Sequence, residues 1–213
     1  METNNGYLLV VEDIPDILAL LDTTLKFKGY RVVTAHNGQE AYELIQKEYP
    51  ALVVTDILMP KMDGFSLVHR LRLDPQTRHI PVIFLSATYV APEDKAFALT
   101  IGATRFMEKP VSLEEFLPTI EELLGKPAPS PSEPISETDF YTGYRKRLEI
   151  KLAEKNTQIT RAEGLLRSVS ESEKEAFSVY LHQAINERKE ILRLLDEINI
   201  HLAKETSTNE TKT

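Results

Sequence analysis

Residues 51–64 of the chain read ALVVTDILMPKMDG. An apolar run rich in valine leads here into a carboxylate, Asp56, and then into a turn marked by Pro60 and Asp63-Gly64. Such a run is typical of a strand that is buried on both faces, and Pro, Asp and Gly are typical of the turn that follows. The stretch therefore predicts a buried strand with a charge at its end, where the strand reaches the edge of its sheet.

Composition limits the kinds of protein to consider. The chain has 213 residues, a formal net charge of −8, 42% hydrophobic residues and no cysteine. The negative charge disfavours nucleic acid or an anionic membrane as the main partner, and the lack of cysteine excludes disulfides and thiolate chemistry. The first residues do not resemble a signal peptide and no apolar run is long enough to span a bilayer, so we expect a cytoplasmic protein.

The first half of the chain alternates between two patterns. Apolar, strand-like runs lie at 7–11, 31–35, 51–56, 81–87 and 104–108, and helical patterns lie at 15–27, 38–48, 64–73, 92–101 and 113–124. Alternation of this kind is typical of βαβ units that build a parallel sheet with helices on both faces. We predict a doubly wound α/β domain over residues 6–124.

The second half is of a different kind. A stretch rich in Pro and Ser at 125–137 predicts an extended linker. From 138 to 204 apolar residues recur at helical spacing, and the capping patterns Ser170-Glu173 and Ser172-Glu175 predict that a second helix starts there. The apolar faces must be buried, in a helical hairpin, in one long coiled coil or against a second copy. The tail at 205–213 is expected to be disordered.

Polar and charged residues lie at the ends of several predicted strands. Glu12 and Asp13 come directly after the first run, Asp56 ends the third, Ser86 lies at the end of the fourth, and Lys109 follows the fifth. The carboxyl ends of parallel strands meet at one edge of a sheet, where ligands bind. Three carboxylates gathered there would repel one another unless a hard cation compensates them, and oxygen ligands suit Mg²⁺. The hydroxyl and the lysine could hold an anion beside that metal, so the pattern indicates a site for Mg²⁺ and a phosphoryl group.

Taken in order, these motifs resemble the receiver domains of bacterial two-component response regulators. The resemblance is carried by Glu12-Asp13, the D-x-x-M-P-x-M-D-G block at 56–64, Ser86-Ala87 and the F-M-E-K-P block at 106–110. It covers residues 6–124, and the ordered set is far more specific than any one motif. It implies a flavodoxin-like five-stranded parallel sheet in the order 2-1-3-4-5.

The resemblance also implies a role for each matching position in the phosphoryl site. Asp56 would be the phosphoacceptor, and Lys109 would pair with the phosphoryl oxygens. Glu12, Asp13, Asp56 and the backbone carbonyl of Leu58 would hold Mg²⁺. Glu12 stands where an aspartate is often found, and the apolar Leu58 is expected to hinder an attacking water and to slow dephosphorylation.

Two further positions would switch when the site is phosphorylated. By the resemblance, Ser86 would turn inward to the phosphoryl group and Phe106 would follow into the vacated space, with a cis peptide bond between Lys109 and Pro110. Taken singly, Ser86 could equally be a turn hydroxyl and Phe106 a core residue. Movement of the pair would alter the surface formed by the fourth helix, fifth strand and fifth helix.

These motifs lead to three hypotheses about function. The first is a response regulator that receives phosphate from a sensor histidine kinase and signals to a downstream protein, as a homodimer through its C-terminal helices; it would catalyse only its own phosphorylation and dephosphorylation. The second is a phosphorelay intermediate that passes phosphate from Asp56 to a histidine on a partner or to His182. The third, an enzyme of the haloacid dehalogenase type, needs an aspartate where Leu58 stands, and is the weakest.

Overall fold

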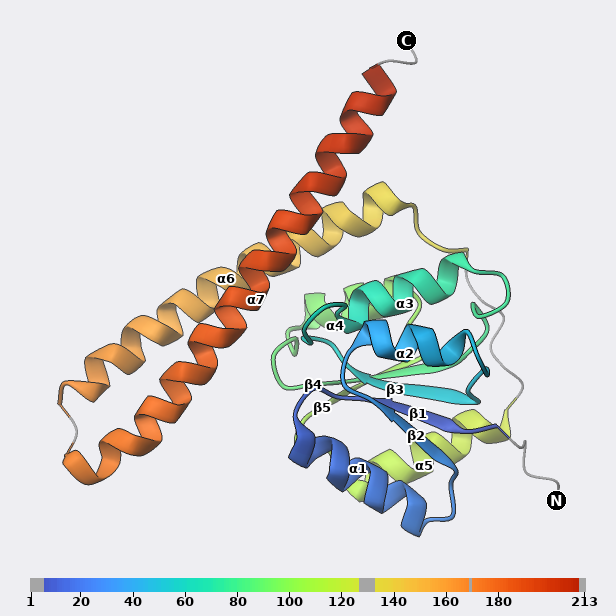
Figure 1. The fold of residues 1–213 in the computed structure, drawn as a ribbon, viewed down its shortest axis with the longest axis horizontal. Coiled ribbons are helices and arrows are strands. Elements are labelled where there is room, and N and C mark those ends of the chain that lie inside the picture. The colour runs from blue at the N-terminus through green and yellow to red at the C-terminus, as the bar shows by residue number, and fades with distance from the viewer. Residues whose placement is uncertain (1–5, 127–132, 169, 211–213) are drawn as a thin grey trace. The chain divides into compact units, whose positions relative to one another are not determined.

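Two units make up the chain, one at residues 1–135 and one at 136–213. The computed structural model describes residues 6–126, 133–168 and 170–210 (Figure 1). In the first unit the elements alternate as follows: β1 Leu8–Val11, α1 Pro15–Phe27, β2 Val32–Ala35, α2 Gly38–Ile45, β3 Leu52–Asp56, α3 Gly64–Leu73, β4 Val82–Ser86, α4 Pro92–Thr100, β5 Arg105–Glu108 and α5 Leu113–Gly125. Each lies within a few residues of the range predicted from its sequence pattern.

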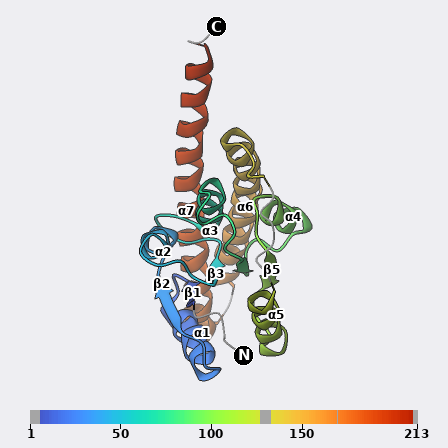
Figure 2. The ribbon, with the colours of Figure 1, turned by 90° about the vertical axis from the view of Figure 1, so that its right-hand side faces the viewer.

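The five strands form one parallel sheet in the order β2-β1-β3-β4-β5. The predicted doubly wound, flavodoxin-like fold is therefore confirmed. Helices α1 and α5 cover one face of the sheet, and α2, α3 and α4 cover the other (Figures 1 and 2). Because strand order reverses next to β1, the ends of β1 and β3 open the crevice in which ligands bind in such sheets.

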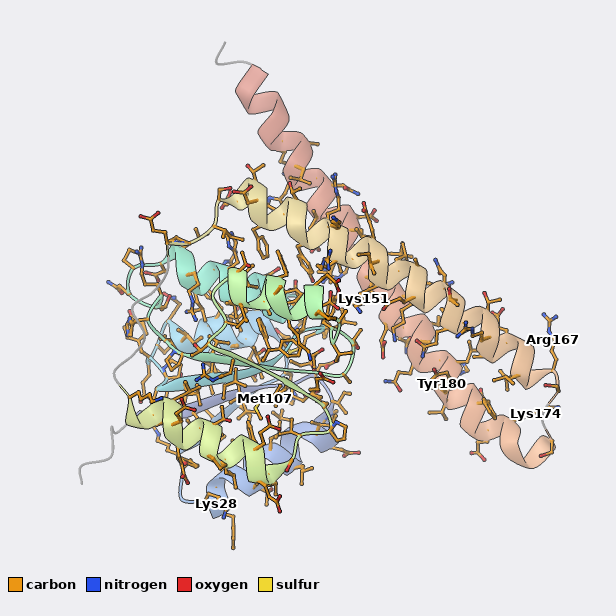
Figure 3. The ribbon with its side chains drawn as sticks, turned by 180° about the vertical axis from the view of Figure 1, so that it is seen from behind. Lys28, Met107, Lys151, Arg167, Lys174 and Tyr180 are labelled. Carbon is orange, nitrogen blue, oxygen red and sulfur yellow. The ribbon has the colours of Figure 1, made fainter. Side chains whose placement is uncertain are left out.

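The core explains why the strands read as continuous apolar runs. Alternate residues of each strand point to opposite faces, and both faces are covered by helices. Toward α1 and α5 the sheet packs Val10, Val54 and Met107 against Leu25 and Phe116, among other buried residues; Met107 points from the sheet toward α5 (Figure 3). On the opposite face the rings of Phe84 and Phe65 meet edge to face, with centroids 5.3 Å apart.

The turn after β3 depends on two neighbouring residues. Asp63 is the N-cap of α3, and its carboxylate accepts the backbone N–H of Ser66 at 2.9 Å. Gly64 lies so close to the strand that an added Cβ would stand 2.2 Å from the carbonyl oxygen of Asp56. Only a residue without a side chain fits there, so this glycine lets α3 start directly behind the strand that carries the predicted phosphoacceptor.

The second unit is a pair of antiparallel helices, α6 Glu137–Leu166 and α7 Glu171–Glu210, which pack against each other. The ring of Tyr141 near the start of α6 stacks on His201 near the end of α7, with centroids 4.7 Å apart. The predicted C-terminal hairpin is confirmed, and the alternative of one long helix is wrong, because the chain reverses between Leu166 and Glu171.

The ends of helices α5, α6 and α7 can be compared with the ranges predicted from the sequence. Helix α5 ends at Gly125 and α6 begins at Glu137. The linker at 125–137 stays a prediction, because residues 127–132 lie outside the part that the structure describes. Helix α7 continues to Glu210, into the stretch 205–213 that we expected to be disordered; residues 211–213 are outside the described range. Among the helices described, none is both long and apolar enough to cross a membrane.

Replacing Gly64 with alanine tests the turn after β3. Because the new methyl group would collide with the Asp56 carbonyl, we expect Gly64→Ala to lower the free energy of unfolding of the α/β unit by about 2 kcal/mol or more. Hydrogen exchange of the β3 backbone amides measures this unit alone. The matched control is Gly164→Ala in α6, where an added Cβ meets nothing within 4 Å and should stabilise the helix by about 0.5–1 kcal/mol. Unchanged exchange in Gly64→Ala would contradict the proposed steric constraint.

Candidate functional site

The sheet brings the predicted site residues to one edge. Asp56 is the last residue of β3 and Ser86 the last of β4, while Glu12 follows β1 and Lys109 follows β5. The neighbouring strands are in register there, since Asp56 pairs with Leu85 and Ser86 with Glu108. Residues that are far apart in the sequence therefore meet because the strands they follow are parallel and adjacent.

An ion-paired lysine lies at the centre of this edge. The Lys109 ammonium donates to Asp56 Oδ1 and to Glu12 Oε2, both at 2.5 Å. The side chains are largely enclosed, with 14% of Lys109, 12% of Asp56 and 2% of Glu12 exposed. The peptide bond between Lys109 and Pro110 is cis, as the resemblance implied.

Burial and charge act together on the protonation of this cluster. Burial raises the pKa of Asp56 to about 6; the ammonium of Lys109 lowers it, and the negative charges of Glu12 and Asp13 raise it further. The pKa of Lys109 is raised: burial alone would lower it, but Asp56 and Glu12 outweigh that effect. The ion pairs described join one ammonium to two carboxylates, so the cluster is short of positive charge.

This deficit fits a divalent cation. Carboxylate oxygens from Glu12, Asp13 and Asp56 are the ligands that Mg²⁺ prefers, and Asp13 lies close enough to raise the pKa of Asp56. In the arrangement described, however, no three acidic or histidine side chains of residues 6–126, 133–168 and 170–210 are grouped so as to hold an ion. The donor set suits the metal, but the carboxylates of Glu12 and Asp56 are paired with the lysine.

The loop after β3 orients the Asp56 carboxylate. Its second oxygen, Oδ2, accepts the backbone N–H of Leu58 at 2.8 Å. The hydroxyl of Thr55 donates to the backbone carbonyl of Asp56, also at 2.8 Å. With Oδ1 on Lys109 and Oδ2 on a backbone amide, the carboxylate is held in one orientation at the end of its strand.

The two predicted switch residues lie at different depths. Ser86 is buried, and its Oγ accepts the backbone N–H groups of Thr88 and Tyr89 at 3.2 and 3.1 Å, so in this state the hydroxyl caps the loop after β4. Phe106 is half-buried in β5, and the Lys95 ammonium lies 5.9 Å from its ring centroid. The switch roles of Ser86 and Phe106 stay predictions.

One contact in the cluster was not foreseen. Glu12 was expected to be a metal ligand, and its pairing with Lys109 joins residues 97 positions apart in the sequence. The sequence showed a glutamate at position 12, with a longer side chain than aspartate, but did not identify its partner. The candidate relay histidine, His182, is exposed on α7, and its Nδ1 lies 2.7 Å from the backbone carbonyl of Ser178.

Known proteins resemble the first unit in sequence and in fold. The chain matches the response regulator receiver domain family over residues 8–121. It is 40% identical over 124 residues to the "Probable transcriptional regulator ycf27" of Porphyra purpurea, covering 58% of this chain and 49% of that protein. It is 32% identical over 134 residues to the response regulator SaeR of Staphylococcus aureus (strain USA300), covering 63% and 57%.

A solved structure is similar to this chain as well. The chemotaxis response regulator CheY4 of Vibrio cholerae is 33% identical with a TM-score of 0.52, over 55% of this chain and 98% of that one. The chain spans about half the length of the curated relatives that it matches. Since the family match covers more than half of the chain and the sheet has the receiver strand order, the chain belongs to the response regulator receiver family.

Proposed function

We propose that this chain is a response regulator that accepts a phosphoryl group on Asp56 from a sensor histidine kinase. The observation that carries the proposal is the Asp56 carboxylate itself, enclosed at the end of β3 and 2.5 Å from the Lys109 ammonium. Its family is not a classical enzyme family. The chemistry proposed is therefore the chain's own phosphorylation and dephosphorylation.

The transfer is a nucleophilic displacement at phosphorus. An oxygen of Asp56 forms the new O–P bond while the N–P bond of the donor phosphohistidine breaks, and the leaving imidazole takes a proton from water. Glu12, Asp13, Asp56 and the carbonyl of Leu58 would hold Mg²⁺, which when bound neutralises charge on the phosphoryl oxygens. Lys109 would then pair with a phosphoryl oxygen, because its ammonium already lies beside the attacking carboxylate.

Phosphorylation would change the positions of the Ser86 and Phe106 side chains. A phosphoryl group on Asp56 offers strong acceptor oxygens, so the Ser86 hydroxyl would leave the amides of Thr88 and Tyr89 and donate to it. Phe106, half-buried on the neighbouring strand, would move into the space released. The change would then reach the surface that α4, β5 and α5 form, where a downstream protein binds.

We propose that the helical hairpin is the output module. It would associate with a second copy of itself or bind another protein. Its packing leaves several large apolar side chains exposed, including Ile150 at 41%, Val179 at 66%, Leu192 at 43% and Ile200 at 55%. We propose that these side chains contribute to the contact with a protein partner. The net charge of −8 of the whole chain disfavours nucleic acid as the main partner of the protein.

A second candidate function is a relay to histidine. His182 is exposed, and its contact between Nδ1 and the Ser178 carbonyl places the proton on Nδ1. The other nitrogen, Nε2, is then the nucleophile that could take the phosphoryl group, as the O–P bond on Asp56 breaks and the N–P bond forms.

Radiolabelling tests the phosphoacceptor and separates the two candidates. With Mg²⁺ and labelled acetyl phosphate, we expect the native chain to incorporate label and Asp56→Asn to incorporate none, because an amide is not a nucleophile here. The control is Asp196→Asn, at an exposed position of α7, which should incorporate label normally. Equal labelling of Asp56→Asn would overturn the proposed function, and label in a base-stable histidine adduct that requires both Asp56 and His182 would favour the relay.

The side chain at position 58 should set the lifetime of the phosphorylated state. Leu58 is apolar and only partly exposed beside Asp56, so it cannot orient a water for attack on the phosphoryl group. We expect Leu58→Asn to shorten the aspartyl-phosphate lifetime several-fold, measured as loss of label after removal of the donor. Leu58→Met, which keeps an apolar side chain of similar size, is the control, and equal lifetimes for all three chains would remove this role.

The raised pKa of Asp56 makes a prediction about stability and pH in metal-free buffer. A carboxyl whose pKa is about 6 in the folded chain and 3.8 unfolded stabilises the fold below pH 3.8, and this contribution is lost as the pH rises through 6. Relative to Asp56→Asn, the native chain should lose about 2 kcal/mol of unfolding free energy between about pH 4 and about pH 7. Urea denaturation in EDTA measures the difference, excess Mg²⁺ should restore stability at neutral pH, and a pH-independent difference would contradict the assignment.

A further inference from the structure

Helix α7 carries a second row of residues beside its buried row. The buried row contains Ala184, Ile191 and Ile198, which are 1%, 0% and 3% exposed. The second row, called the open seam below, repeats at alternating spacings of three and four residues and consists of Ile185, Arg188, Leu192, Leu195, Asn199 and Leu202. Leu192 is 43% exposed there and Asn199 is exposed as well. Such spacing is typical of a helix face that packs against a second helix.

Two polar residues, Arg188 and Asn199, interrupt the open seam. Arg188 is half-buried, and its Nε is buried without a hydrogen-bond partner among the residues that the structure describes. A buried donor that makes no hydrogen bond costs free energy. Polar residues at seam positions also fix the register in which two helices pair. The helix that covers the open seam is therefore expected to bring a hydrogen-bond acceptor to Arg188.

A second, antiparallel copy of α7 brings such an acceptor. In one register Arg188 of one copy lies opposite Asn199 of the other, whose side-chain carbonyl can accept from the guanidinium. The two-fold axis of such a pair makes every contact occur twice. The same register sets apolar residues against each other in the remaining layers, Leu192 against Leu195 and Ile185 against Leu202.

The charges beside the open seam favour the same arrangement. Lys189 and Asp196 are exposed and lie on the flank of the seam away from the buried row. In the antiparallel pair these flanks meet, and Lys189 of one copy lies beside the same two layers as Asp196 of the other. A parallel pair in register would instead set Arg188 against Arg188, and like charges in contact repel. Charge complementarity thus selects the antiparallel pair.

We propose that a second copy of this chain binds the open seam of α7, with the two α7 helices antiparallel about a two-fold axis. The proposal rests on the proposed role of the hairpin as the output module and names its partner. Arg188 and Asn199 set the register, and the apolar layers beside them supply the buried area.

Sedimentation velocity on the full chain, over a concentration series, tests the contact. We expect the native chain to sediment as a dimer. Leu192→Asp should raise the dissociation constant at least about a hundredfold, because each dimer would bury two carboxylates in apolar layers. The matched control is Leu165→Asp, which changes a leucine of α6 that is 47% exposed and lies outside the open seam. It should leave the dissociation constant unchanged.

Reversal of the flanking charges tests the register without changing the apolar layers. Lys189→Glu and Asp196→Lys should each raise the dissociation constant about tenfold at low salt, since each sets like charges together twice. The double reversal should restore it to within about threefold of the native value. The two residues are seven positions apart in one helix, roughly 10 Å along its axis, so the recovery must come from contact between copies.

Crosslinking tests the orientation, because the native chain has no cysteine. Mild oxidation of a mixture of Arg188→Cys and Asn199→Cys should give a disulfide-linked dimer of the two variants. Neither variant alone should crosslink, because its two thiols would lie roughly 16 Å apart along the pair. A parallel pair predicts the reverse, with each variant crosslinked to itself.

Three outcomes would overturn the proposal: a native chain that sediments as a monomer, equal effects of Leu192→Asp and Leu165→Asp, or crosslinking of each cysteine variant with itself. Labelling of the same chains with acetyl phosphate reports on Asp56 separately. Label on a monomeric native chain would leave the phosphoacceptor standing and remove only the open seam as a binding surface. A dimer without label would remove the phosphoacceptor and leave the seam.

Discussion

Uncompensated negative charge at the edge of a buried sheet is the constraint on which the site depends. Burial raises the pKa of the Asp56 carboxyl, and one ammonium, that of Lys109, offsets this effect only in part. Buried charges are tolerated where they are paired and hydrogen-bonded, so the surrounding backbone supplies a further donor from Leu58. The result is a carboxylate that is held in place, short of positive charge, and suited to a reaction that brings a cation and a phosphoryl group to it.

The fold produces this situation from ordinary packing rules. Strands covered by helices on both faces can carry polar groups only at their ends, and parallel strands bring those ends to the same edge. The absence of a side chain at Gly64 lets α3 start directly behind β3. Ser86 satisfies two amides of the following loop. Each local solution stabilises the fold and, at the same time, places a polar group within the crevice.

Much of the fold and the site could be predicted because both depend on pattern and order along the chain. Apolar runs and helical patterns located the strands and helices of the first unit, and strand ends located Asp56 and Lys109. The pairing of Glu12 with Lys109 could not be predicted, since a long side chain chooses among several partners in space and its sequence neighbours do not record the choice. The extension of α7 to Glu210 was also missed, because the polar end of that helix has no apolar periodicity.

The packing between α6 and α7 limits how a signal could change the hairpin. Within its largely apolar interface Lys155 of α6 pairs with Glu187 of α7, and both side chains are mostly buried, at 13% and 20% exposed. A polar pair in an apolar seam favours the single register that satisfies it, and the stacking of Tyr141 on His201 fixes the same antiparallel register near the other end. Sliding of α6 along α7 would separate the two charges, and among the described contacts each would keep only a glutamine of its own helix as a partner, Gln158 for Lys155 and Gln183 for Glu187. A signal that reaches this unit is therefore expected to change what the outer face of the hairpin contacts, while the packing of α6 on α7 stays constant.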